Sequence, residues 1–475
     1  MALFDRIANI FRVPDLRKRI LFTLALLAVY RLGAHIPTPG INADLLQQWF
    51  EQNRGTWLGL VDIFSGGNFR RLTIFALGIM PYITASIILQ LMTVVWPYLE
   101  RLQKEGELGR RKITQYTRYL TVFLSAFQAL TIALTLQRGA AQGVQYVLAP
   151  GPSFIAMTVL TLTTGTIFIM WLGEQISDRG IGNGMSLIIF AGIVVGIPRA
   201  VGEINDKVRV TGEWQAHHLL ALLIMMLAVV AIIVFVEGAQ RRVPVQYAKR
   251  VVGRRMMGGA MTYLPIRINT GGVIPVIFAS SVLTFPQTFA LFLPESRHME
   301  PGWVRSLVQG LESFRNALAW GEPLYTLLYI VGIIFFCYFY VSIIFNPDEL
   351  ADNMRKWGGF VPGIRPGRRT SEYINDILTR VTFVGGVYLA LISIIPEWMI
   401  SGIHLHHLPL IGGWAERMLP NAVLQGLGVN FYFGGTSLLI VVGVAMDTVN
   451  QIEAQLTMRH YEGFTTRGRI RGRRT

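Results

Sequence analysis

The stretch that decides the fold runs from Gly59 to Leu99 and reads GLVDIFSGGNFRRLTIFALGIMPYITASIILQLMTVVWPYL. A short apolar piece ends at Ser65-Gly66-Gly67, two arginines follow, and the chain is then uncharged from Leu72 to Leu99. That uncharged run can cross a bilayer, because about 20 helical residues rising about 1.5 Å each span the hydrocarbon core. The motif Gly-x-x-Pro at Gly78–Pro81 interrupts the run. We interpret this combination of half-helix, flexible break and interrupted membrane helix as the moving part of the protein.

The composition of the whole chain indicates an integral membrane protein. Of 475 residues, 52% are apolar and only 15% are charged, whereas soluble domains carry about 25% charged residues. Long uncharged segments recur along the chain, and the alternating segments of a membrane β-barrel are absent. The sequence therefore predicts an all-α polytopic membrane protein with ten transmembrane helices. The expected spans are Ile20–Pro37, Leu72–Leu99, Tyr119–Gln137, Phe154–Gly173, Met185–Pro198, Leu219–Val236, Gly271–Leu293, Pro323–Phe345, Val381–Pro396 and Phe433–Asn450.

The distribution of basic residues predicts the orientation of these helices. Lys and Arg are enriched in cytoplasmic loops, and ten spans with a cytoplasmic N-terminus return the C-terminus to the same side. Most of the 43 Lys and Arg residues then lie on the cytoplasmic side, which carries the net charge of +15. Attraction to anionic lipid headgroups explains the single basic residues beside helices.

Two of the basic cytoplasmic loops are longer than a helix connection requires. Residues 237–267 and 346–380 each contribute about 30 residues, whereas such connections usually take about 2–8 residues. Both loops mix charge with turn and apolar residues, so we expect ordered protrusions that contact a large polyanionic or acidic partner. The basic tail, residues 456–475, is typical of a disordered end with non-specific electrostatic binding.

An internal repeat indicates two halves. The segments Gly78–Ser86 and Gly272–Ser280 both read G-x-x-P-x-x-x-A-S, and each lies in the second span of a group of five. Transporter and channel folds often contain two halves with interrupted helices at matching positions. We therefore expect an N-terminal half at residues 1–210 and a C-terminal half at residues 211–455, hinged at the loop 199–215.

Pairs of apolar residues four positions apart are candidate walls of a path through the protein. In the second span Ile79 and Ile83 share a helical face, and Met185 and Ile189 do so in the fifth. Ordinary helix packing explains any single pair equally well. Acidic residues lie near helix ends and none lies in mid-span, whereas intramembrane charges usually mark ion pathways. The pattern favours a passive, hydrophobically gated conduit over a coupled ion pump.

The chemistry-bearing residues give no sign of an enzyme, a cofactor site or a metal site. With a single cysteine, Cys337, the chain has no disulfide framework and no thiolate metal site. No phosphate-binding loop is present, and we interpret the run Gly180–Gly184 as a tight turn between two helices. Two other classes stay open at this point. A small-solute secondary transporter fits the two-half architecture, and a membrane enzyme would need a nucleophile–base pair or metal cluster that the sequence does not offer.

Long segments of the chain are similar to one known family. They are FSGGNFRRLTIFALGIMPYITASIILQL, KEGELGRRKITQYTRY, WLGEQISDRGIGNGMSLIIFAGIV, GVIPVIFASS, FNPDELADNMRKWGGFVPGIRPGRRT and FYFGGTSLLIVVGVAMD. On these segments the chain resembles the SecY family, the channel subunits of the bacterial protein translocase, over nearly its whole length. The resemblance implies an hourglass channel between two pseudo-symmetric five-helix halves. Such a channel passes unfolded polypeptides across the membrane, releases transmembrane segments sideways into lipid, and has no catalytic activity of its own.

The resemblance also implies which residues move and which residues seal the channel. A plug at about residues 58–67 would fill the external funnel, with the Gly66-Gly67 break as its hinge. The lateral gate would be helices two and three against helices seven and eight. The implied plug residues are Leu60, Val61, Ile63, Phe64, Ser65, Gly66 and Gly67. The implied pore ring is Ile79, Ile83, Met185, Ile189, Ile277 and Ile440, in which Met185 departs from the isoleucine that is usual in the family.

Partners and location follow from the same resemblance. It implies the subunits SecE and SecG, and transport of nascent polypeptides with signal sequences, driven by the SecA ATPase or the ribosome. Arg254 and Arg255 match positions that dock the ribosome, and Arg365 matches one that SecA needs; arginine can grip phosphate or carboxylate with two hydrogen bonds. The implied location is the bacterial inner (plasma) membrane, with both termini cytoplasmic, and a thylakoid membrane stays an alternative.

One exterior segment departs from the family. Residues 402–428 are longer than the family leads us to expect, and they contain His404, His406 and His407. Histidine is a common metal ligand, but no cysteine joins these three and acidic residues are few. We therefore interpret the segment as a lineage-specific loop.

Overall fold

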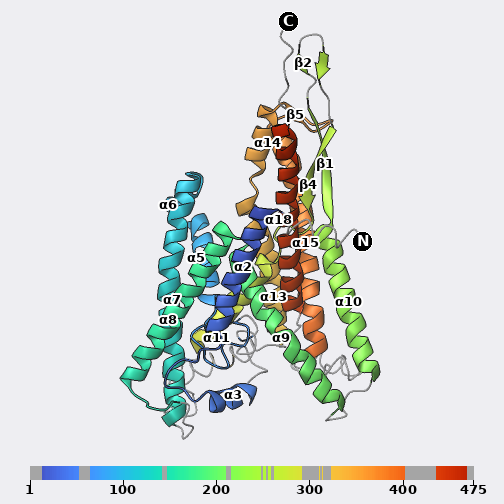
Figure 1. The fold of residues 1–475 in the computed structure, drawn as a ribbon. Coiled ribbons are helices and arrows are strands. Elements are labelled where there is room, and N and C mark those ends of the chain that lie inside the picture. Colours follow the sequence, from blue (N-terminus) through green and yellow to red (C-terminus); the bar gives the residue numbers. More distant parts are fainter. Residues whose placement is uncertain are drawn as a thin grey trace. The chain divides into compact units, whose positions relative to one another are not determined.

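The computed structural model is mostly helical and forms two compact units (Figure 1). It describes residues 13–52, 62, 65–141, 147–209, 216–247, 250–252, 255–257, 261–290, 310, 313, 322–401 and 435–467. The first unit comprises Met1–Asp206, Gln287–Gln309 and Val444–Thr475, and the second comprises Lys207–Pro286 and Gly310–Gly443. The helical content confirms the predicted class, whereas the division into five-helix halves at residue 210 stays a prediction.

The first unit is built from antiparallel packing of long apolar helices. α5 packs against α7, α7 against α8, and α2 against α8. Several of these helices begin with proline in the first turn, where its missing N–H has no partner to lose and its φ is already helical. The helices are α2 (Pro14–Gly33), α3 (Ala43–Gln52), α5 (Met80–Val95), α6 (Pro97–Lys104), α7 (Glu107–Ala141), α8 (Pro152–Arg179) and α9 (Gly184–Arg209), followed by most of α18 (Gly435–Arg467).

Two breaks divide the expected second span. Residues 69–79 form turns, so the helix begins at Met80 and not at Leu72. At its other end the helix stops at Val95, and α6 leaves it at an angle of 99°. Pro97 causes this second break, because proline disfavours helical backbone in the preceding residue, and Trp96 is indeed extended, with φ −104° and ψ 112°.

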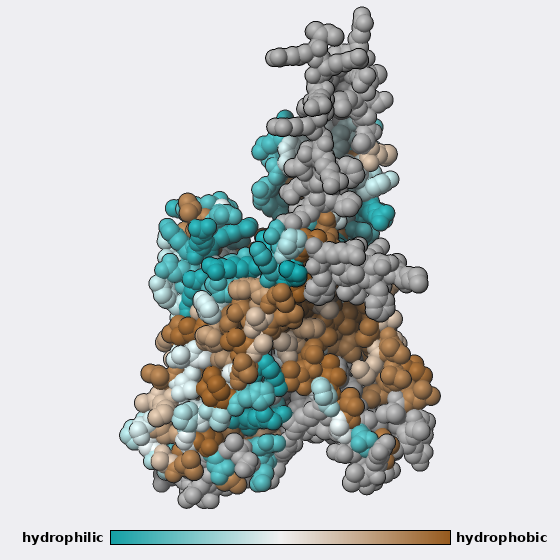
Figure 2. Space-filling model, viewed as in Figure 1, coloured by the Kyte–Doolittle hydropathy of each residue, from teal (hydrophilic) through white to brown (hydrophobic). Residues whose placement is uncertain are grey.

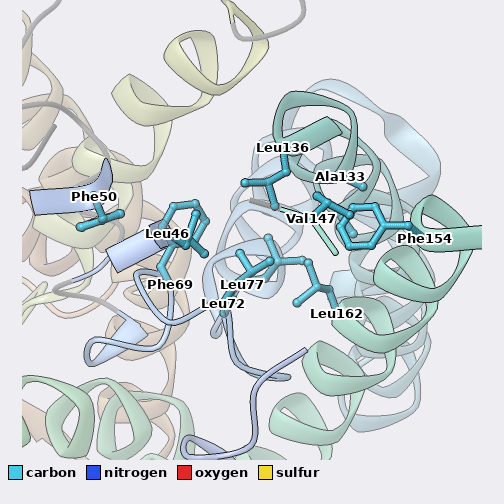
Figure 3. Close-up of a cluster of buried hydrophobic side chains, with 12 residues drawn as sticks. Leu46, Phe50, Phe69, Leu72, Leu77, Ala133, Leu136, Val147, Phe154 and Leu162 are labelled. Carbon is cyan, nitrogen blue, oxygen red and sulfur yellow. The ribbon is translucent and has the colours of Figure 1, made fainter. Parts of the chain in front are cut away.

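The core of the first unit collects the turn segment against α7 and α8. Leu72 and Leu77 lie between Phe69 and the side chains of Phe154 and Leu162 (Figure 3). Each buried apolar side chain of this size contributes about 1.5–3 kcal/mol to stability. The segment before α5 is therefore anchored in the core by its buried side chains, although it lacks regular structure.

The second unit combines helices with two small sheets, one of three strands and one of two. The short first part of α18, up to Gly443, belongs to it. Its other elements are α10 (Ala216–Gly238), β1 (Gln240–Tyr247), β2 (Arg250–Val252), β3 (Arg255–Met257), β4 (Met261–Arg267), most of α11 (Ile274–Ala290), α13 (Pro323–Ile344), α14 (Pro347–Lys356), β5 (Gly359–Phe360) and α15 (Arg368–Ser401).

The strands bring the two long loops together. β1 pairs antiparallel with β4, from Gln240 opposite Arg267 to Gln246 opposite Met261. β5 of the second loop pairs with the other edge of β1. Buried side chains from β1, β4, α14 and α15 form one core under this sheet, including Val243, Met354 and Ile374. The described parts of both loops contain regular structure, but the predicted all-α class did not include these strands.

The described residues contain five helices long and apolar enough to cross a membrane, or six if the bent pair α5–α6 counts as one span. The helices α9, α10 and α11 contain shorter apolar stretches. Every expected span overlaps a helix, and the count of ten transmembrane helices stays a prediction.

The surface of the first unit is divided by hydropathy. Hydrophilic residues gather at the α6 end, and hydrophobic residues cover much of the helices below it (Figure 2). Phe123 of α7 and Leu160 of α8 are apolar residues that are exposed on this unit.

Candidate functional site

Asp62 organises the turn that precedes the first repeat motif. Its backbone oxygen accepts hydrogen bonds from the Gly67 N–H at 2.9 Å and from Ser65 Oγ at 3.1 Å. Its carboxylate Oδ1 accepts from the Arg70 N–H at 3.1 Å. Asp62 is 1% exposed and Arg70 is 8% exposed, and hydrogen bonds to a charged group are worth about 1.5–3 kcal/mol. Hydrogen bonds to Asp62 therefore connect the beginning of this turn with Ser65, Gly67 and Arg70.

Tyr30 ties this turn to α2 and α8. The Tyr30 hydroxyl donates to the Ser65 carbonyl at 3.3 Å and accepts from Asn68 Nδ2 at 3.3 Å. The Tyr30 ring stacks on Phe75 with 5.8 Å between centroids, and Phe75 stacks on Phe168 of α8 at 6.0 Å. Stacked aromatic pairs at such centroid distances contribute about 0.5–1.5 kcal/mol beyond their buried area. The turn is thus linked to two helices of its unit.

Gly66 lies directly against α9. Its φ is +72°, a region that side chains with a Cβ disfavour. A Cβ placed on Gly66 would lie 2.6 Å from the Cα of Gly192. Only a glycine fits this position. Any movement of the turn would have to separate its backbone from that of α9. The role of Gly66-Gly67 as a hinge stays a prediction.

The predicted plug lies mostly outside the described residues. Of its seven members, the structure describes Ser65, Gly66 and Gly67. The other four, Leu60, Val61, Ile63 and Phe64, fall outside the description.

The first unit carries four of the six predicted ring residues. Ile79 is 2% exposed and directly precedes α5, and Ile83, 7% exposed, donates its N–H to the Ile79 carbonyl at 3.1 Å. On α9, Ile189 is 2% exposed and Met185 is half-buried. The Met185 sulfur lies so close to Gly173 of α8 that a Cβ there would overlap it. Met185 thus packs against its own unit.

The second unit carries the other two predicted ring residues. Ile277 of α11 is 4% exposed and Ile440 of α18 is fully buried. One turn away from each, Val273 and Gly443 pack together, because a Cβ on Gly443 would lie 2.6 Å from Val273 Cγ1. The ring as a whole stays a prediction, since its members belong to separate units.

The two repeat motifs have the same backbone geometry. Gly78 has φ +56° and Gly272 has φ +60°. In each motif the helix begins two residues later, at Met80 in α5 and at Ile274 in α11, with proline as its second residue. The left-handed glycine turns the chain, and the proline favours a new helix start. The sequence repeat is therefore also a structural repeat.

The predicted basic contact residues lie in and near the strands. Arg255 begins β3, and Arg254 lies outside the described residues. Arg365 is exposed in the turn between β5 and α15, where Thr370 Oγ1 donates to its carbonyl at 3.1 Å. Cys337 is buried in α13. Residues 402–428 with the three histidines fall outside the description, and no group of three potential metal ligands occurs among the residues that were described.

Two polar positions were missed by sequence reasoning. Asp62 sits in an apolar piece, where a buried carboxylate usually needs a specific partner, so its charge could have served as a signal. Asn269 of the second unit is 5% exposed, and its Nδ2 donates to Glu237 Oε1 at 2.5 Å and to the Gly272 carbonyl at 3.1 Å. The sequence signal for Asn269 was a polar amide just before the glycines of the second repeat motif. The strands could have been read from the alternation in QRRVPVQY (β1).

Comparisons with known proteins agree on one family. The SecY family model matches residues 73–449. The protein translocase subunit SecY of Streptomyces griseus is 47% identical over 468 residues, 97% of this chain and 100% of the relative. That of Escherichia coli (strain K12) is 46% identical over 461 residues, 96% of each chain.

Solved structures give the same fold. One described as a protein conducting channel has a TM-score of 0.57 at 16% identity, covering 92% of this chain and 91% of that chain. The channel of a canine ribosome–channel complex from the endoplasmic reticulum has a TM-score of 0.56 at 17% identity, with the same coverage. The chain belongs to the SecY family of protein translocase subunits.

Proposed function

We propose that the chain is the central channel of a Sec translocase, which passes unfolded polypeptides across the membrane and releases transmembrane segments sideways into lipid. The observation that carries this proposal is the end-to-end match to protein translocase subunits, which covers 97% of this chain. The fold shared with a protein conducting channel supports it. In this role the chain performs no catalysis, and a SecA ATPase or a ribosome supplies the energy.

The pore ring seals the resting channel by excluding water. Its members are Ile79, Ile83, Met185, Ile189, Ile277 and Ile440. A narrow apolar constriction without fixed charges dewets and blocks ions, while aliphatic side chains can adapt to different passing polypeptides. The plug at about residues 58–67 adds to the seal. The lateral gate is formed by α5 and α7 on one side and α11 and α13 on the other in this proposal.

The two-stranded sheet β2–β3 of the second unit offers a docking surface on the cytoplasmic side. In the chain it lies between β1 and β4, which share one core with α14 and α15, so force applied at β2–β3 is passed on to the helices. A related channel occurs in a ribosome–channel complex, which supports a ribosome as partner here. SecE clamps the two halves, SecG completes the complex, and SecA binds near Arg365. The complex lies in the bacterial inner membrane with both termini cytoplasmic.

Purification and reconstitution test the function. The tagged chain, extracted from its own membrane in mild detergent, is expected to bring along a small SecE-like membrane protein. Proteoliposomes of this complex are expected to import an unfolded secretory protein when SecA and ATP are added. A chain that purifies without such a subunit and exchanges small solutes instead would point to a secondary transporter and overturn the proposal.

Charge reversal at Arg254 and Arg255 tests the ribosome contact. The double variant Arg254→Glu and Arg255→Glu is expected to weaken ribosome binding. If both arginines neutralise phosphates, the slope of log K against log salt should fall by about 2. Binding is measured by co-sedimentation with ribosomes across a salt series. Arg241→Glu with Arg242→Glu is the matched control, because both residues are exposed on β1, which belongs to the three-stranded sheet β4–β1–β5, whereas Arg255 lies in the separate two-stranded sheet β2–β3. An unaltered slope in the first variant would exclude RNA phosphate as the target.

A further inference from the structure

One buried side chain, that of Asn269, connects the base of the three-stranded sheet β4–β1–β5 with the start of α11. β1 begins two residues after α10 ends at Gly238, and β4 ends at Arg267, seven residues before α11 begins. The ladder continues to this base, because the Ile268 N–H donates to the Ala239 carbonyl at 3.1 Å. Asn269 follows immediately, so it occupies the corner where strand gives way to helix.

Asn269 connects both sides of that corner. Its Nδ2 donates to Glu237 Oε1 at 2.5 Å in the last turn of α10 and to the Gly272 carbonyl at 3.1 Å just before α11. The side chain is 5% exposed, so solvent competes little for either bond. A hydrogen bond to a carboxylate is roughly twice as strong as one between neutral groups. One amide therefore sets the geometry between the end of α10 and the first residues of α11.

The corner is also backed by α15. A Cβ placed on Gly385 would lie 2.6 Å from the Ile268 carbonyl oxygen and 3.6 Å from the Asn269 Cα. Tyr388, one turn further on the same helix, is close enough to Glu237 to interact with it electrostatically. The segment 268–269 thus has a helix backbone on one side and the Asn269 bonds on the other, which leaves little room for it to bend.

We propose that Asn269 is a positioning residue that makes the sheet and α11 move together, so that a partner bound to the strands shifts α11. The inference rests on the proposed channel function for its consequence, because α11 contains the ring residue Ile277. Its mechanical part does not depend on that function. Without the Asn269 bonds, the left-handed Gly272 would leave a flexible link between the two elements.

Distance measurements between spin labels test the mechanical part. Labels are placed on β4 at Met261→Cys and on α11 at Val282→Cys, both exposed positions, in a background with Cys337→Ala. In nanodiscs, Asn269→Ala is expected to give a broader distance distribution than the parent protein. Thr270→Ala is the matched control, because the exposed Thr270 hydroxyl bonds only to the nearby Arg267 carbonyl among the described contacts. Equal widths for Asn269→Ala and its parent would overturn the inference.

Variants that exchange the donor and the acceptor between residues 269 and 237 distinguish a loss of the Asn269 bond from general misfolding. Asn269→Asp places a carboxylate opposite Glu237 and is expected to broaden the distribution. Adding Glu237→Gln returns an amide donor to this pair but not to the Gly272 carbonyl, so it is expected to narrow the distribution part of the way back to the parent width. A double variant that shows no narrowing at all would mean that the bond to residue 237 does not hold the corner, and it would also overturn the inference.

Transport measurements test the consequence. Asn269→Ala is expected to bind ribosomes or SecA like the parent but to import an unfolded protein about tenfold more slowly, which corresponds to about 1.4 kcal/mol. Binding and import that fall together would contradict transmission through Asn269. A parent protein that imports nothing would instead contradict the proposed channel function, while the label distances would still decide the mechanical part.

Discussion

Replacing Ile83 and Ile189 by serine is expected to raise the resting ion conductance of the channel by about tenfold or more. Both side chains are almost fully buried, at 7% and 2% exposure, and they lie on α5 and α9 of the same unit. A hydroxyl at each position attracts water into the constriction, and a hydrated constriction no longer blocks ions by dewetting. Single-channel recordings in planar bilayers, without translocating substrate, measure the effect.

The control for this variant needs equally buried isoleucines outside the ring. Ile169 and Ile176 of α8 are both fully buried, so Ile169→Ser with Ile176→Ser introduces the same hydroxyls into the same unit. This control is expected to lower stability without raising conductance. If conductance is unchanged in the Ile83 and Ile189 variant, these two residues do not belong to the seal. If it rises equally in the control, loosened packing explains the leak.

Replacing Gly66 by alanine is expected to lower the free energy of unfolding by about 2–5 kcal/mol. The left-handed backbone at φ +72° costs an L-residue about 1–2 kcal/mol. Overpacking adds about 1–3 kcal/mol, because the new methyl group would lie 2.6 Å from the Gly192 Cα and neither backbone can yield easily. Unfolding in mixed micelles with increasing denaturing detergent measures the change.

Gly202→Ala is the matched control. Gly202 lies in α9, as Gly192 does, and a Cβ there would have no atom within 4 Å. Alanine is expected to stabilise this helical position by about 0.5–1 kcal/mol, because glycine is the poorer helix former. Equal stability of Gly66→Ala and the parent would mean that the turn can leave α9 at little cost. The close contact would then be no anchor for the segment before α5.

Much of the fold follows from local properties of the sequence. The run from Leu72 to Leu99 announced a membrane helix, and α5 lies within it. The Gly-x-x-Pro motifs predicted matching interruptions, and Gly78 and Gly272 do share their left-handed backbone. Hydropathy, proline and glycine are local signals in the sequence, so the structure they favour can be predicted without knowing which segments pack nearby.

The candidate site was only partly accessible in this way. The pairs Ile79 and Ile83, and Met185 and Ile189, follow from helical spacing, and the remaining ring positions needed a resemblance. Nothing in the spacing indicated that the Met185 sulfur would pack beside Gly173 of α8. Periodicity identifies a shared face, but it does not identify what that face meets.

The sequence by itself determined the membrane class, the basic loops and the internal repeat, because each depends on composition or on residues a few positions apart. Only the tertiary structure decided the rest. It paired β5 with β1 across more than 100 residues of chain, set Gly66 against Gly192, and gave Asn269 its partners on α10 and before α11. Such contacts join segments that are distant in the chain, and their energies depend on distances that exist only once the helices have packed.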